Sequence, residues 1–279
     1  MDMKKKIAIM YDFDGTLAPI NMQEYSFIPE LNMEPGDFWA QCSKLAEQFN
    51  MDSNLSYMYL MTSKAKERGL KITKESFINH GKSITYFDGV TTWFKRINEF
   101  AASIGLEVDH YIISSGIQEI LQGCSISNEF KKMFACSFCY DENNVPIWPA
   151  QAVNYTTKTQ YIYRVRKGLI DNLYDSDELN DYVYDRKKLL PHSNMIYIGD
   201  GQTDVPSMKL VKNQGGHSIA VYNPTSIKKY KLSKQLYDDG RVNFIAPADY
   251  TQGSRMENII KDILIKIVAN NKLDEYKDA

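Results

Sequence analysis

Residues 7–11 form a short, continuous apolar run that ends at Asp12. A run of this length without alternating polar residues is typical of a strand buried on both faces of a parallel sheet. Similar runs occur at residues 111–113, 195–198 and 218–222. Amphipathic helical patterns lie between and after them, most clearly at residues 90–104 and 256–267. This alternation predicts an α/β fold with a doubly wound, Rossmann-like core around a parallel sheet.

The segment between the first two expected strands has a different pattern. Helical patterns dominate it, at residues 38–49, 55–68 and 74–84. No convincing buried strand interrupts them. We therefore expect two units: an α/β core domain made of residues 1–20 and 87–279, and a small helical cap domain made of residues 21–86.

The composition and the apolar runs exclude several classes of protein. The 33 basic residues nearly balance the 35 acidic ones and are scattered, so no nucleic-acid-binding surface is expected. No run of about 18 apolar residues occurs, so no membrane span is expected. The N-terminal stretch faintly resembles a signal peptide, but its apolar part ends at Asp12 and is too short. We predict a cytoplasmic protein.

The first acidic segment, Asp12-Phe13-Asp14-Gly15-Thr16-Leu17, directly follows the first expected strand. Ligands of open α/β sheets bind beyond the carboxyl ends of the strands. An Asp carboxylate can attack phosphorus directly, and a second one nearby can serve as general acid and then as general base. A plain turn is the alternative. A calcium loop would need a third acidic or amide residue before the glycine, which is missing here.

The second acidic segment, Gly199-Asp200-Gly201-Gln202-Thr203-Asp204, follows the expected strand 195–198. Carboxylates at the end of a strand provide the hard oxygen ligands that Mg²⁺ prefers. Asp204 precedes Val205-Pro206, where a helix could begin, so its alternative role is an N-cap. A capping Asp can also orient the ligands of a metal.

Hydroxyl and amino groups are expected near these carboxylates. Ser114 and Ser115 follow the expected strand 111–113, where a hydroxyl could bind a phosphoryl oxygen. Lys158 begins a helical pattern at residues 159–167 and could neutralise phosphate and carboxylate charge. Taken alone, each residue also fits a role without chemistry. The serines would form a turn or a helix cap, and the lysine would be a solvated side chain.

Cys136 and Cys139 form one CxxC pair. A zinc site needs further ligands, and the sequence offers no second Cys pair and no nearby His pair. The aromatic residues around the pair favour a strand, whereas a redox pair would lie at a helix N-terminus. Structural thiols are the favoured interpretation, and a redox or zinc module is the alternative.

The set of candidate residues resembles a known superfamily. Asp, Ser, Lys and Asp follow one another at the ends of successive strand–helix units, which resembles the motif order of haloacid dehalogenase-like (HAD) phosphatases, and the DxDGT and GDGxxD segments are highly specific. The helical insert is similar to that of the phosphoserine-phosphatase-like subgroup. The sequence departs from this subgroup at Gly15, where phosphoserine phosphatases usually carry Ser.

The resemblance implies roles for particular residues. Asp12 would be the nucleophile, and Asp14 the general acid and base. Ser114, with Ser115 beside it, and Lys158 would hold the phosphoryl group. The Mg²⁺ site would comprise Asp12, Asp14 through its backbone carbonyl, Asp200 and Asp204. Lys167, at the far end of the same helix, is a weaker substitute for Lys158.

The predicted function is therefore a magnesium-dependent phosphatase that hydrolyses a small phosphorylated metabolite, a phosphate monoester, through an aspartyl-phosphate intermediate. The alternatives are a phosphotransferase or phosphomutase of the same superfamily, and a non-catalytic phosphate-binding protein. In the insert, Arg68 and Glu24 could contact the substrate, although a solvated side chain, for Arg68 at a helix C-terminus, is the favoured interpretation. The sequence gives no indication of the oligomeric state.

Overall fold

The computed structural model describes residues 5–183 and 189–276. The expected core domain also includes residues 1–4, 184–188 and 277–279, which lie outside the described residues. A seven-stranded sheet in the order β4-β3-β2-β1-β5-β6-β7 forms the centre. The strands are β1 (Lys5–Tyr11), β2 (Leu106–Ile117), β3 (Lys132–Tyr140), β4 (Pro146–Gln151), β5 (Met195–Gly199), β6 (His217–Tyr222) and β7 (Phe244–Pro247). All neighbours pair in parallel except β3 and β4, which form an antiparallel hairpin.

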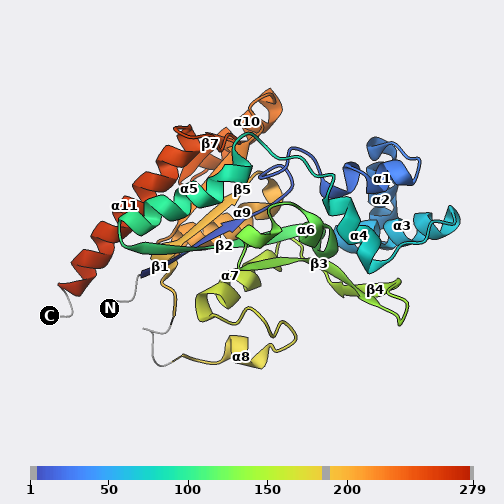
Figure 1. Cartoon of the computed structure of the whole chain (residues 1–279), viewed down its shortest axis with the longest axis horizontal. Coiled ribbons are helices and arrows are strands. Elements are labelled where there is room, and N and C mark those ends of the chain that lie inside the picture. Colours follow the sequence, from blue (N-terminus) through green and yellow to red (C-terminus); the bar gives the residue numbers. More distant parts are fainter. Residues whose placement is uncertain (1–4, 184–188, 277–279) are drawn as a thin grey trace.

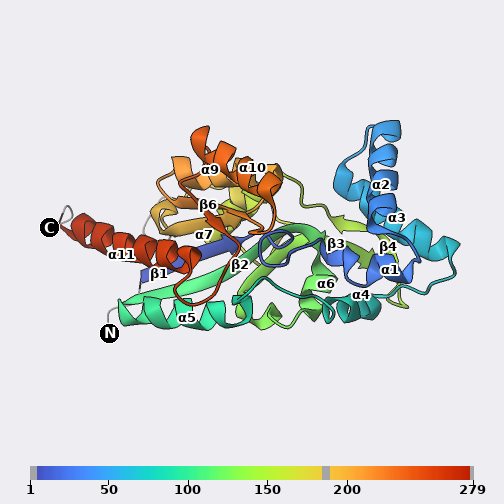
Figure 2. The ribbon, with the colours of Figure 1, turned by 90° about the horizontal axis from the view of Figure 1, so that it is seen from above.

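Helices cover both faces of the sheet. The core helices are α5 (Val90–Ser103), α6 (Gln118–Gly123), α7 (Lys158–Lys167), α8 (Asp177–Asn180), α9 (Val205–Asn213), α10 (Ile227–Asp238) and α11 (Arg255–Glu275). Figures 1 and 2 show α5 on one face and α7, α9 and α10 on the other. Among the described residues, no helix is long and apolar enough to cross a membrane. The predicted doubly wound α/β fold is confirmed.

Local patterns located most of these elements correctly. The predicted strands correspond to β1, the middle of β2, β5 and β6. The strands β4 and β7 were missed because their signals are poor: β4 carries Pro146 and Pro149, and β7 has only four residues. Each lies at an edge of the sheet, where burial imposes a weaker apolar pattern.

The helices between β1 and α5 lie beyond one end of the sheet (Figures 1 and 2). They are α1 (Phe27–Glu30), α2 (Pro35–Phe49), α3 (Ser53–Glu67) and α4 (Lys74–Gly81). The helix α4 packs tightly on the core helix α6, since a Cβ added at Gly123 would lie 1.7 Å from the Ile78 carbonyl oxygen. Phe77 of α4 also stacks on Phe138 of β3 at 5.6 Å. The division at residues 21–86 stays a prediction, and α4 anchors this segment on the core.

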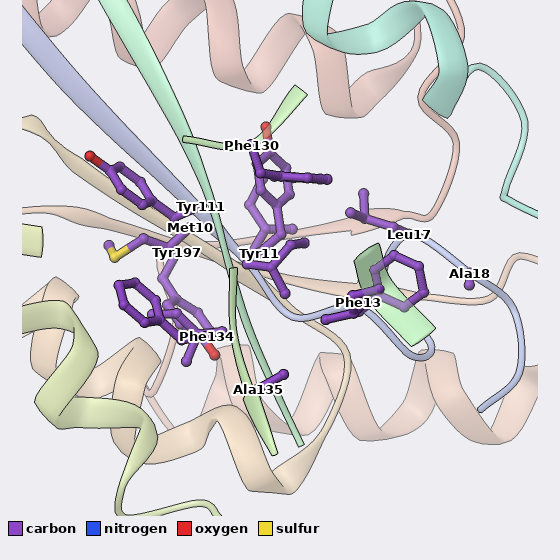
Figure 3. Close-up of a cluster of buried hydrophobic side chains, with 14 of the residues drawn as sticks. Met10, Tyr11, Phe13, Leu17, Ala18, Tyr111, Phe130, Phe134, Ala135 and Tyr197 are labelled. Carbon is purple, nitrogen blue, oxygen red and sulfur yellow. The ribbon is translucent and has the colours of Figure 1, made fainter. Parts of the chain in front are cut away.

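Aromatic and aliphatic side chains hold the end of β1 in the core (Figure 3). Tyr11 makes edge contacts with Phe94 and Phe130, at centroid distances of 6.0 and 6.3 Å. Beyond the strand, Phe13 and Leu17 are fully buried. Because residues on both sides of Asp12 are packed in this way, the backbone that carries its carboxylate is held rigidly.

Candidate active site

Parallel pairing brings the two acidic segments together. The strand β1 lies between β2 and β5, with Tyr11 opposite Ile112 on one side and Ile198 on the other. The backbone N–H of Asp12 then donates to the Ile198 carbonyl at 2.9 Å. Asp12 and Asp14 therefore emerge at the same edge of the sheet as Asp200, as expected for the carboxyl ends of parallel strands.

Gly15 allows the turn after Asp12 to pass close to the second acidic segment. Its φ angle is +77°, and an added Cβ would lie 2.3 Å from Asp200 Oδ2. A side chain at this position would be strained in its backbone and would collide with the carboxylate. The departure from the usual Ser of phosphoserine phosphatases thus has a steric reason in this chain.

Lys158 lies at the centre of the buried charges. Its side chain is 1% exposed, and its Nζ donates to Asp12 Oδ1 at 2.9 Å and to Asp204 Oδ1 at 2.7 Å. The carboxylates of Asp12, Asp200 and Asp204 all come within 4.8 Å of one another. The structure therefore brings the predicted Asp and Lys residues of separate segments into one cluster.

Asp204 does not cap the helix α9, although it lies at the N-cap position. Its Oδ1 accepts hydrogen bonds from Lys158 and from the Tyr197 hydroxyl, the latter at 2.8 Å. Its Oδ2 accepts one from the backbone N–H of Gly201 at 3.3 Å. Because Asp204 is fully buried and bonded on both oxygens, it orients Lys158 and the turn that carries Asp200. Its alternative interpretation as an N-cap is wrong.

Lys229, near the start of α10, is a second cation in the cluster. Its Nζ lies 2.6 Å from Asp200 Oδ2, and its side chain is 45% exposed. Lys229 was not predicted from the sequence, because a Lys on an exposed helix normally indicates a solvated side chain. Its one signal was its position just after the expected strand 218–222, at the same edge of the sheet.

Burial and mutual repulsion shift the acidities of this cluster. Burial, together with the neighbouring Asp204, raises the pKa of Asp12 to about 7 despite the opposing effect of Lys158. Burial and the Asp12 carboxylate raise the pKa of Asp14 well above its ordinary value, although the Met22 N–H donates to Asp14 Oδ1 at 2.9 Å. For Lys158, burial opposes the charge, but Asp12 and Asp204 outweigh it and raise the pKa.

The two serines differ in the use of their hydroxyls. Ser114 is 1% exposed, and its Oγ accepts a hydrogen bond from the Gly116 N–H at 3.0 Å. Its hydroxyl hydrogen has no acceptor among the described residues. Ser115 donates its hydroxyl hydrogen to the Val153 carbonyl at 2.7 Å. The geometry therefore favours Ser114 as the donor to a phosphoryl oxygen.

Three further candidates lie elsewhere. Lys167 donates to the carbonyls of Leu179 and Asp181, both at 2.6 Å, so it is no substitute for Lys158.

Cys136 is buried and Cys139 is exposed, as expected of residues three apart on a strand, so their thiols do not converge on one metal. Arg68 lines a separate cavity between α2 and α3.

A buried hydrogen-bond chain supports the strand end that carries Asp12. Trp93 Nε1 donates to the Tyr11 hydroxyl at 2.9 Å, and Tyr11 is 3.0 Å from His110 Nδ1. The other ring nitrogen, Nε2, is 3.0 Å from Asn98 Oδ1. Because the Asn oxygen accepts only, Nε2 carries the hydrogen and Nδ1 accepts from Tyr11. His110 is therefore neutral in the folded protein, a role that the sequence did not indicate.

This chain predicts a pH-dependent loss of stability. Burial lowers the pKa of His110 to about 3, whereas an unfolded His titrates near 6.5. The contribution of neutral His110 is complete above pH 6.5 and falls as the pH decreases, by about 2 kcal/mol at pH 5. Urea unfolding gives the decrease in the free energy of unfolding between pH 7.5 and pH 5. We expect this decrease to be about 2 kcal/mol smaller in His110→Gln than in the wild type. An equal decrease in the two proteins would contradict the assignment of a neutral, buried His110.

The side chains of Asp12, Asp14, Asp200 and Lys158 line one end of a cavity of about 760 Å³. The opposite wall comes from the segment between β1 and β2, and includes Glu24, Trp39 and Tyr57. A small phosphate ester would fit this volume with its phosphoryl group against the core. The described residues thus place buried carboxylates and a buried cation at one end of a cavity.

No protein-family model matches this sequence. An uncharacterized protein of Borreliella burgdorferi is 26% identical over 283 residues, which cover 92% of this chain and 95% of that protein. A HAD family hydrolase from Salmonella enterica serovar Typhi matches with a TM-score of 0.53 at 19% identity, over 80% of this chain and 65% of that one. A substrate-bound phosphoserine phosphatase matches with a TM-score of 0.56 at 15% identity, over 92% and 98% of the two chains. At these identities the likeness to the solved structures concerns the fold.

Proposed function

We propose that this chain, which has the fold of the haloacid dehalogenase-like hydrolases and of the phosphoserine phosphatases among them, is a magnesium-dependent phosphatase of small phosphate monoesters. The observation that carries the proposal is the contact between Asp12 and Lys158 beside Asp200 at one edge of the sheet. A fold alone does not define a function, but this cluster supplies a nucleophile, a cation and hard metal ligands.

The proposed reaction has two chemical steps. Asp12 attacks phosphorus, the bond from phosphorus to the ester oxygen breaks, and Asp14 gives that oxygen its proton. Lys158 and Ser114 stabilise the charge on the phosphoryl oxygens. Water then attacks the phosphorus of aspartyl-phosphate with Asp14 as the base, which releases phosphate and restores the Asp12 carboxylate.

The donor set of the site fits a divalent cation. With all four aspartates ionised, Asp12, Asp14, Asp200 and Asp204 would carry four negative charges against the two positive charges of Lys158 and Lys229, and a divalent cation would balance the difference. Asp12, Asp200 and the backbone carbonyl of Asp14 would hold Mg²⁺, with Asp204 supporting them. When bound, Mg²⁺ would reduce the repulsion between the Asp12 carboxylate and an anionic substrate.

Hydrolysis of 4-nitrophenyl phosphate tests this function. We expect turnover with Mg²⁺, its loss on chelation with EDTA, and its recovery when Mg²⁺ is restored in excess. Added alcohols should not take the phosphoryl group, since water is the proposed acceptor; a phosphorylated alcohol would instead indicate a phosphotransferase. Absence of turnover across a panel of phosphorylated metabolites with Mg²⁺ would contradict the proposal.

A further inference from the structure

The wall of the cavity that faces the carboxylates has its own chemistry. Trp39 of α2 and Tyr57 of α3 lie there, with ring centroids 6.0 Å apart and planes at 74°. The Tyr57 hydroxyl donates to the Ser115 carbonyl at 2.6 Å, which fixes the ring against the core. Two nearly perpendicular rings therefore form an aromatic corner in the part of the cavity where a leaving group would lie.

Glu24 adds a fixed negative charge beside this corner. Its Oε1 accepts hydrogen bonds from Trp39 Nε1, at 2.7 Å, and from the Asn21 side-chain amide. Its Oε2 has no hydrogen-bond donor among the described residues. Gln23, also in the cavity wall, is 2% exposed, and its buried Oε1 likewise lacks a partner within the described part of the chain. This wall therefore offers acceptors to a ligand.

Cations are missing from the same wall. Of the described residues that line the cavity, Lys158 and Lys229 are the basic ones, and both pair with core carboxylates. Arg68, Lys44 and Lys64 line the separate cavity between α2 and α3. A carboxylate on the leaving group would thus meet the Glu24 carboxylate and, among the described residues, no cation other than the two that pair with core carboxylates, which disfavours it electrostatically.

We propose that the leaving group is an alcohol that carries a positively charged nitrogen and no carboxylate, so that the substrate is an amino-alcohol phosphate. This inference rests on the proposed phosphatase function. Aromatic rings such as those of Trp39 and Tyr57 attract a cation through their quadrupoles, and the Glu24 carboxylate attracts it directly. Primary and quaternary ammonium groups share this chemistry. The relative rates of hydrolysis of O-phosphoethanolamine and phosphocholine show which of the two the site prefers.

The wild-type enzyme with Mg²⁺ provides the first test. We expect kcat/KM for phosphocholine or O-phosphoethanolamine to exceed that for 3,3-dimethylbutyl phosphate, whose alcohol has the shape of choline but no positive charge, by about tenfold. O-phosphoserine should be poorer than O-phosphoethanolamine, because it adds a carboxylate. If 4-nitrophenyl phosphate is hydrolysed but the charged and neutral esters react equally, this inference fails while the proposed function stands.

The variant Glu24→Gln tests the origin of the preference. It removes the charge, yet its carbonyl oxygen can still accept from Trp39. We expect the ratio of kcat/KM between phosphocholine and 3,3-dimethylbutyl phosphate to fall about tenfold in this variant. Glu34→Gln, which removes a charge from an exposed residue in the separate cavity, should keep the wild-type ratio. An unchanged ratio in Glu24→Gln would overturn the assignment of Glu24.

Discussion

Asp12→Asn should abolish turnover of 4-nitrophenyl phosphate, with a loss on the order of 10⁴-fold or more, because the amide cannot form the phosphoryl-enzyme intermediate. The protein should remain folded. Asn is isosteric with Asp, and its side-chain oxygen can still accept the hydrogen bond that Lys158 donates at 2.9 Å. Lys158 also keeps its buried partner Asp204. Steady-state rates with Mg²⁺ and circular dichroism of the same samples measure both expectations.

A matched control separates this effect from a general loss of charge. Asp37→Asn makes the same chemical change at an exposed position on α2, outside the cavity of the carboxylates. Its rates should equal those of the wild type. Substantial activity in folded Asp12→Asn would contradict the assignment of Asp12 as the nucleophile. Equal losses of turnover in the two variants would indicate an indirect effect on the protein.

Asp14→Asn should discriminate between leaving groups. An alkoxide is a strong base and leaves slowly without a proton, whereas nitrophenolate leaves almost unaided. Burial and the Asp12 carboxylate raise the pKa of Asp14 well above its ordinary value, which is the direction that a general acid needs. We expect phosphorylation of the enzyme by alkyl phosphates to slow by about 10²–10⁴-fold, and by nitrophenyl phosphate far less.

The second step gives this variant a distinct signature. Without Asp14, the attacking water lacks its base, so nitrophenyl phosphate should leave phosphorylated Asp12 to accumulate. In the wild type, the Met22 N–H donates a hydrogen bond to Asp14 Oδ1 at 2.9 Å. The side-chain oxygen of Asn can accept the same hydrogen bond, so the loop should keep its shape. Rapid-quench measurement of the phosphoryl-enzyme decides the matter. Equal slowing of the first step for both leaving groups would show that Asp14 is not the acid.

The sequence alone predicted the layout of the core. Continuous apolar runs located β1, β2, β5 and β6, because strands buried on both faces must be apolar throughout. The acidic segments after β1 and β5 were then expected at one edge of the sheet, since parallel strands end together. Edge strands β4 and β7 were missed, because a strand with one neighbour is buried less completely.

Tertiary structure decided which polar groups meet. The sequence placed Asp12, Asp200, Lys158 and Ser114 near strand or helix ends, and these are local properties. The pairing of Lys158 with Asp12, 146 residues apart, depends on how α7 packs against the sheet. The same packing directs Lys167 to the carbonyls of Leu179 and Asp181 and makes Asp204 a partner of Lys158. The contact of Ser115 with the Val153 carbonyl likewise joins residues far apart in the chain. Local periodicity selects the elements, but the contacts between distant elements determine where each side chain points.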